Sequence, residues 1–256
     1  MQCQGSGEIS HCPFNDNILQ EYIRIIPADI VSWAVEVRFP VGGKMKHILF
    51  DFDGTLFDTS NIVYNKLMEF TSVEPPSWEQ LRNLSSWQVL KTLKIPVFKL
   101  RKISKHITSE ISDNLGEIEI QNGITPLLSE LKREKIKLHI LTSNSYENVS
   151  GLLSLYELDH YFSSINNSKS LFGKSHDIRH FMKVNRVSAP ELAFIGDETR
   201  DLRAANKANV KFYPVSWGYN SEAAFNNITD QFISSDTYEL LNCLRLDEFV
   251  GEIDGL

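Results

Sequence analysis

The chain has 256 residues, of which 42% are hydrophobic and 23% are charged, and its formal net charge is -7. These values are typical of a globular protein with one large domain, or with one domain that carries an insertion. The negative charge argues against a general nucleic-acid-binding protein, which would usually present a basic surface. One local positive site could still bind a small anion.

The cysteines and the hydropathy pattern indicate where the protein works. Cys3, Cys12 and Cys243 are widely separated, which argues against a disulfide framework and against a zinc site. No apolar run is long enough to span a bilayer, and the first residues lack the basic-then-apolar pattern of a secretory signal. We therefore expect a cytoplasmic protein without membrane or nucleic-acid partners.

The first 44 residues form a segment whose role the sequence does not reveal. Residues 24–39 are fairly apolar, but Asp29, Glu36 and Arg38 interrupt them. Met45 directly precedes the first strong strand signal and could be an alternative start. We expect residues 1–44 to be an N-terminal extension, for which a transit or a regulatory role stays open.

Short apolar runs along the rest of the chain predict buried strands, with helix-like segments between them. Ile124, Leu127, Leu128 and Leu131, for example, would form one apolar stripe on a helix. Strands that alternate with helices indicate an α/β fold, with a parallel sheet and helices on both faces. The predicted strands are 47–50, 138–141, 192–195 and 210–215.

Residues 60–122 interrupt this alternation. They have helix-like apolar spacing and contain the helix breaker Pro75-Pro76, so we interpret them as a helical insertion after the first strand. Gly123 and Pro126 mark the return of the chain to the core. The prediction therefore divides the chain into an extension, an α/β core and an inserted helical cap, which are residues 1–44, residues 45–59 with 123–256, and residues 60–122.

Polar residues follow the predicted strands at the points where the strands end. In an open parallel sheet, the active site lies beyond the carboxyl ends of the strands. These side chains are therefore expected to converge on one edge of the sheet. They are Asp51 and Asp53 after the first strand, Thr142, Ser143 and Asn144 after the second, and Asp197 and Asp201 after the third, with Lys174 between the second and the third.

This set of residues suits phosphoryl transfer. Asp51, Asp53 and Asp197 would repel one another unless a cation lay among them, and oxygen ligands without His or Cys favour Mg²⁺. One carboxylate can attack phosphorus, and a second, two residues on, can protonate the leaving oxygen and then activate water. Thr142 and Lys174 could hold the phosphoryl oxygens.

Four segments resemble the motifs of the haloacid dehalogenase (HAD) superfamily, in the order in which that superfamily has them. They are DFDGTLFD at 51–58, ILTSN at 140–144, the lysine of FGKS at 172–175 and IGDETRD at 195–201. The stretch WGYN at 217–220 resembles the phosphoglycolate-phosphatase-like branch of that superfamily.

The resemblance implies a Rossmann-like three-layer core with a helical cap after the first motif, and it implies dependence on Mg²⁺. By position, Asp51 would be the nucleophile and Asp53 the acid and base. The residues expected to bind the phosphate group are Thr142, Ser143, Asn144, Lys174 and Gly54. The expected metal ligands are Asp51, the backbone carbonyl of Asp53, and Asp197, with Asp201 as a further ligand or directly behind them.

We therefore predict a Mg²⁺-dependent phosphatase that hydrolyses a small, phosphoglycolate-like phosphate monoester through an aspartyl-phosphate intermediate. Its partner would be a small phosphorylated metabolite, and the protein would be a monomer or a homodimer. Pyrophosphate hydrolysis, sugar phosphomutation and phosphonate hydrolysis stay open, the last of which needs a cap lysine such as Lys91, Lys94 or Lys99. The alternative from another class is a non-catalytic binding module with the same fold.

Several of these residues also have a simpler interpretation when taken alone. The pair Asp53-Gly54 is favoured in hairpin turns, and Thr142 could end a strand or cap a helix. A lone Lys174 would usually be a surface lysine, and Asp201 could make a local salt bridge. Only their place in the series of motifs favours the catalytic interpretation.

Two further groups of residues are expected to be structural. Glu198 and Arg200, inside the third motif, should be structural or solvent-facing. Trp78, Trp87 and Phe98 should pack in the core of the insertion, although one of them could reach the site.

Overall fold

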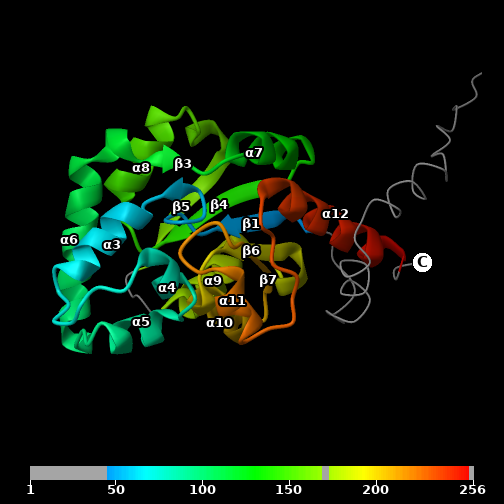
Figure 1. Ribbon diagram of the computed structural model, residues 1–256. Helices are drawn as coiled ribbons and strands as arrows, with labels where there is room; N and C mark the ends of the chain where they lie inside the picture. Colours follow the sequence, from blue (N-terminus) through cyan, green and yellow to red (C-terminus); the bar gives the residue numbers. More distant parts are fainter. Residues whose placement is uncertain (1–44, 169–172, 254–256) are drawn as a thin grey trace, which may run out of the picture. The chain divides into compact units, whose positions relative to one another are not determined.

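The computed structural model describes residues 45–168 and 173–253, and the predictions for residues 1–44, including Cys3 and Cys12, and for Leu171 and Phe172 lie outside them. The core of the described chain is a parallel sheet of five strands in the order β5-β4-β1-β6-β7 (Figure 1). The strands are β1 (His47–Phe50), β4 (Lys137–Thr142), β5 (Phe162–Asn167), β6 (Leu192–Gly196) and β7 (Lys211–Pro214).

Helices cover both faces of this sheet, as the alternation of strands and helices predicts (Figure 1). In β1, Ile48 and Phe50 belong to the apolar cluster on one face, whereas Leu49 belongs to the cluster on the other. The helices of the first face are α7 (Ile124–Arg133), α8 (Tyr146–Leu155) and α12 (Thr237–Ile253). Those of the second face are α9 (Lys174–Asn185), α10 (Thr199–Ala208) and α11 (Glu222–Asn226).

The position of β1 at the centre of the sheet explains why the polar residues converge. β1 pairs with β4 on one side and with β6 on the other, and Phe50 lies opposite Ile140 and Ile195. The chain leaves β4 and β6 toward opposite ends of the sheet, so a crevice forms beyond their carboxyl ends. The residues directly after these three strands therefore line that crevice.

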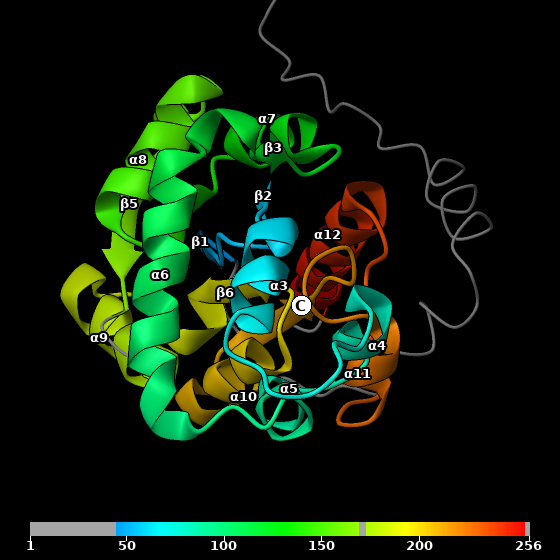
Figure 2. The ribbon, with the colours of Figure 1, turned by 60° about the vertical axis from the view of Figure 1, so that its left-hand side comes forward.

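The segment after β1 is helical and has an apolar cluster of its own. Helices α3 and α6 pack against each other, with α4 and α5 beyond one end of the pair (Figure 2). Helices α4 and α5 each begin with a capping box, formed by Ser77 with Gln80 and by Ser85 with Gln88. The elements are α3 (Ser60–Met68), α4 (Trp78–Arg82), α5 (Ser86–Thr92), the 3₁₀ turns Val97–Lys99 and Leu115–Glu117, and α6 (Leu100–Asp113). The buried residues of the cluster are Leu81, Leu90, Leu93, Ile95 and Ile103.

The prediction that all three large aromatic residues of the insertion lie in its core is wrong for two of them. Trp78 packs against the cluster, but Trp87 is 57% exposed and Phe98 is 81% exposed. The elements that carry them are too short to bury many side chains, since α5 buries only Leu90 and the 3₁₀ turn with Phe98 buries none.

Two parts of the sheet structure are absent from the prediction. Strand β5 has the sequence FSSINN and lies at the edge of the sheet, where half-exposed polar residues are tolerated. A small antiparallel ladder joins β2 (Phe57–Asp58) to β3 (Glu119–Ile120) at the two ends of the helical segment. Its two-residue strands give no periodic signal. Within the described residues, no helix has the length and apolar character needed to cross a membrane.

Candidate active site

Asp51 is the first residue after β1, and the sheet holds it in place. Its backbone N–H donates to the Ile195 carbonyl at 2.8 Å, which extends the pairing of β1 with β6 by one residue. Its side chain is buried. Oδ1 accepts a hydrogen bond from the Phe52 N–H at 2.8 Å, and Oδ2 lies 2.7 Å from Nζ of Lys174.

Lys174 begins α9 and is buried between two carboxylates. Its Nζ lies 2.7 Å from Asp51 Oδ2 and 2.8 Å from Asp201 Oδ1. Burial alone would lower the pKa of Lys174, but Asp201 and Asp51 outweigh it and raise that pKa above the ordinary lysine value. Lys174 is therefore a buried ammonium group and not a surface lysine.

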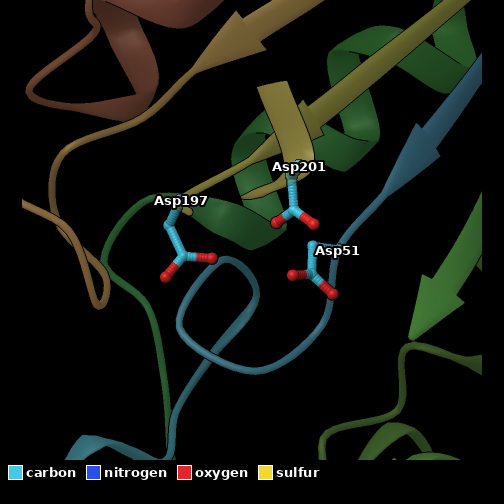
Figure 3. Close-up of side chains that lie close together, drawn as sticks. All are labelled: Asp51, Asp197 and Asp201. Atoms are coloured by element: carbon cyan, nitrogen blue, oxygen red, sulfur yellow. The ribbon is translucent and has the colours of Figure 1, made fainter. Parts of the chain in front are cut away.

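Three buried carboxylates, those of Asp51, Asp197 and Asp201, point toward one another (Figure 3). One oxygen of each lies within 4.8 Å of the other two. Burial, reinforced by Asp51 and Glu198, raises the pKa of Asp197 to about 8. Burial also raises the pKa of Asp201 well above its ordinary value, although Lys174 opposes it.

These raised pKa values have a simple cause, because one ammonium group cannot offset three carboxylates in a buried site. Burial would raise the pKa of Asp51 too, but Lys174 outweighs it and lowers that pKa. At Asp201 Lys174 does not outweigh burial, and Asp197 is not one of the two carboxylates that Lys174 contacts. A divalent cation would supply the missing positive charge, and carboxylate oxygens are the ligands of hard divalent cations. The residues present therefore fit a bound metal ion.

Two glycines allow the backbone to approach Asp197 closely. A Cβ atom on Gly54 or on Gly218 would lie 2.2 Å from Asp197 Oδ2, and Gly54 also has a φ of +85°, which favours glycine. In this space Thr55 Oγ1 donates to Asp197 Oδ1 at 2.6 Å, and the Tyr219 N–H donates to Oδ2 at 2.6 Å. The carboxylate of Asp197 is therefore held in one orientation.

Asp53 lies in a different environment from the three clustered carboxylates. Its Oδ1 accepts from Asn144 Nδ2 at 3.0 Å and from Thr59 Oγ1 at 3.3 Å, and Thr142 Oγ1 donates to Oδ2 at 3.4 Å. Burial, followed by the charge of Asp51, raises the pKa of Asp53 to about 6. A carboxyl group with this pKa can give and take a proton near neutral pH, which suits a general acid and base.

The residues after β4 gather around Asp53. Thr142, the last residue of β4, accepts from the Asn144 N–H at 2.9 Å as well as donating to Asp53. Asn144 also accepts from Asn148 at 3.0 Å, so its side chain is fixed on both sides. Ser143 lines the same cavity as Asp53. The structure thus brings every predicted site residue to one edge of the sheet, and their individual roles stay predictions.

The sequence did not single out several residues that shape the site. The Thr59 hydroxyl, which donates to Asp53, also lies 2.5 Å from the Tyr219 hydroxyl. Trp217 Nε1 donates to the Thr55 carbonyl at 3.0 Å, which fixes the loop around Asp53. Trp217 and Tyr219 lie within WGYN, which was noted for its resemblance alone. Their distance along the chain from the first motif leaves no local signal of these contacts.

A cavity of about 190 Å³ lies beside Asp53, Ser143 and Asn144, and the helices of the insertion form its other wall. Glu198 and Arg200 line it too. Glu198 is only 7% exposed, so it is not solvent-facing. It forms an ion pair with Arg200 and accepts from Ser86 Oγ at 3.1 Å. Glu198 therefore links α10 to the insertion.

Known proteins resemble this chain over most of its length. The model of the haloacid dehalogenase-like hydrolase family matches residues 48–215. A phosphoglycolate phosphatase of Synechococcus elongatus is 25% identical over 182 residues, which cover 69% of this chain and 86% of that protein. The pyrophosphatase PpaX of Bacillus cereus is 21% identical over 210 residues, which cover 78% and 97% of the two chains.

Solved structures share the fold. A structure described as a predicted phosphatase from Clostridium acetobutylicum superimposes with a TM-score of 0.65 at 22% identity, over 78% of this chain and 98% of that one. The α/β fold with a parallel sheet, predicted from the sequence, is thereby confirmed.

Proposed function

Because the chain belongs to the haloacid dehalogenase-like hydrolase family, we propose that it is a Mg²⁺-dependent phosphatase of a small phosphate monoester, acting through an aspartyl-phosphate. The observation that carries the proposal is the pairing of two unlike carboxyl groups. Asp51 is kept ionised by Lys174, and Asp53, two residues on, has a pKa of about 6. Since two relatives are named phosphoglycolate phosphatase and pyrophosphatase, 2-phosphoglycolate and pyrophosphate are the first substrates to test.

In the first step, Asp51 is the nucleophile. One of its carboxylate oxygens forms a bond to phosphorus, and the bond between phosphorus and the ester oxygen breaks. Asp53 gives its proton to the departing oxygen, which leaves as a neutral alcohol. The pKa of about 6 means that part of the Asp53 population carries this proton near neutral pH.

In the second step, water attacks the phosphorus of the aspartyl-phosphate. Asp53, now a carboxylate, takes a proton from the water, and the bond between phosphorus and Asp51 breaks. Inorganic phosphate leaves, and Asp51 and Asp53 return to their starting states. The hydrogen bonds from Asn144 and Thr59 keep the Asp53 carboxyl group in place for both proton transfers.

The remaining predicted residues would hold the phosphoryl group and the metal ion. Lys174 would offer its ammonium group to the phosphoryl oxygens, and Thr142, Ser143, Asn144 and the Gly54 backbone would add hydrogen bonds. The Mg²⁺ ion would be held by Asp51, Asp197, Asp201 and the backbone carbonyl of Asp53. When bound, it would supply positive charge that stabilises the charge developing on the phosphoryl group.

We further infer that residues 60–122 act as a cap over a core formed by residues 45–59 and 123–253. The cavity beside Asp53 lies between these helices and the ends of the strands. A site covered in this way admits small molecules more easily than protein chains. Phosphonate hydrolysis finds no support, since Lys91, Lys94 and Lys99 are absent from the residues that line this cavity.

The proposal is tested by phosphate release from a panel of small esters and pyrophosphate, with and without Mg²⁺. Asp51→Asn should abolish release and leave the fold intact. The matched control is Asp58→Asn, because Asp58 is an exposed aspartate in β2, seven residues further on, whose hydrogen bond from the Ser60 N–H an asparagine can keep. Release at the wild-type rate by Asp51→Asn would contradict the assigned nucleophile.

A further inference from the structure

The cavity beside Asp53 has an apolar wall that the proposed reaction does not explain. The helices of the insertion provide that wall, and the polar side chains they add to it are the hydroxyls of Ser86, Ser104 and Thr108 and the indole N–H of Trp78. None of the lining residues that come from these helices is charged. The apolar lining residues of α3 to α6 include Val63, Leu67, Trp78, Leu81, Val89 and Ile103.

Among the residues that the structure describes, the charged side chains that line the cavity leave no cation free for a second anionic group. They are Asp53, Glu198 and Arg200, all from the core. The Arg200 guanidinium is paired with Glu198, so their charges offset each other. Lys174 does not line this cavity, and its ammonium group already lies between Asp51 and Asp201. A carboxylate or a second phosphate of the substrate would therefore be desolvated here without a cationic partner.

An apolar group would gain free energy in the same place. Cavities of this size that are lined by apolar side chains hold small apolar molecules in preference to water. The apolar wall continues to the catalytic residues through Trp78, whose ring packs edge-on against that of Tyr219 at 5.9 Å. The Tyr219 hydroxyl contacts Thr59, which donates to Asp53. A group in the cavity would thus lie beside the residue that protonates the leaving oxygen.

We propose that this cavity receives the leaving group of the substrate and that the leaving group is an uncharged, apolar alcohol. The substrate class is then a phosphate monoester of a short alkyl or aryl alcohol. This inference rests on the proposed phosphatase activity. It departs from the substrates that the relatives' names suggest, because the leaving groups of 2-phosphoglycolate and pyrophosphate, glycolate and phosphate, are anions.

The first test uses the wild-type protein with Mg²⁺ and a series of ethyl, butyl and hexyl phosphates, whose leaving oxygens are chemically alike. Each added methylene should raise kcat/KM about fourfold until the cavity is filled. Isobutyl phosphate has nearly the shape of 2-phosphoglycolate but carries two methyl groups in place of the carboxylate oxygens, so it lacks the carboxylate charge. It should be hydrolysed with a kcat/KM at least about tenfold higher than that of 2-phosphoglycolate.

The second test fills the cavity. Ser104 is half-buried on α6 and lines the cavity, whereas Ser109 is exposed on the same helix and does not. Ser104→Phe should lower kcat/KM for hexyl phosphate at least about tenfold more than it lowers kcat/KM for ethyl phosphate. Ser109→Phe should leave both values unchanged. The melting temperatures of the two variants show whether each is folded.

The outcomes separate this inference from the proposed function. Hydrolysis of no ester at all would overturn both. Hydrolysis of 2-phosphoglycolate with a kcat/KM above that of isobutyl phosphate would overturn the inference and leave the phosphatase proposal standing. Rates that do not rise from ethyl to hexyl phosphate, or an equal loss for both esters in Ser104→Phe, would also overturn it.

Discussion

Asp197 should destabilise the metal-free protein at neutral pH. Burial, reinforced by Asp51 and Glu198, raises its pKa from 3.8 to about 8, so the folded state binds a proton that the unfolded state has already lost. Its contribution to stability therefore falls as pH rises between about 4 and 8. At pH 7, which is roughly three pH units above the ordinary pKa of aspartate, the loss in the free energy of unfolding is at most about 4 kcal/mol.

The variant Asp197→Asn removes this charge and keeps the shape of the side chain. Its amide can still accept from the Tyr219 N–H and donate to the Thr55 hydroxyl, the two groups that hold the carboxylate. Urea unfolding in the presence of a chelator should show a variant that is more stable than wild type at pH 7, by up to about 4 kcal/mol, and equally stable near pH 4.

The matched control is Asp159→Asn, because Asp159 is exposed. It should change the free energy of unfolding by less than about 0.5 kcal/mol at either pH. If Asp197→Asn were no more stable than wild type at pH 7 without metal, the account of the acidic cluster as a site with an excess of negative charge would be refuted.

Three further predictions concern the same site. Mg²⁺ at one hundred times its dissociation constant should raise the free energy of unfolding of wild type by about 2.7 kcal/mol, and an unchanged melting temperature would count against an intact metal site. Lys174→Met should lower the free energy of unfolding by about 3–5 kcal/mol, because Asp51 and Asp201 lose their ammonium partner. The control Lys183→Met, at an exposed lysine, should leave it unchanged. Equal unfolding curves for Lys174→Met and wild type would disprove the buried pairing. Gly218→Ala should weaken Mg²⁺ binding measured by calorimetry, because the new Cβ would lie 2.2 Å from Asp197 Oδ2, whereas Gly116→Ala, with nothing within 4 Å, should have no effect.

The residues of the site could be predicted because the geometry of a parallel sheet is general. Polar residues at the carboxyl ends of neighbouring strands must meet at one edge, so Asp51, Thr142 and Asp197 could be placed together from the strand signals. Lys174 is different, since no predicted strand directly precedes it and only its place in the series of motifs singled it out. Its burial between two carboxylates comes from the structure.

Other features depend on contacts between distant parts of the chain, which a local pattern does not show. Tyr219 reaches Asp197 and Thr59 from a loop far along the sequence. Strand β5 is half-exposed and polar, so it lacks the apolar run by which the other strands were found. Trp87 is exposed although its side chain is hydrophobic, because Leu90 is the residue that the short helix α5 buries.

If Asp51 carries the phosphoryl group during turnover, its phosphorylated form can be trapped chemically. Borohydride reduces an aspartyl-phosphate to homoserine, so protein quenched during turnover with Mg²⁺ and a hydrolysed ester can be reduced, digested and examined by mass spectrometry. Homoserine is expected at position 51, and only when both Mg²⁺ and the ester are present. Homoserine at position 53 or another aspartate, or at no position while phosphate is being released, would contradict it.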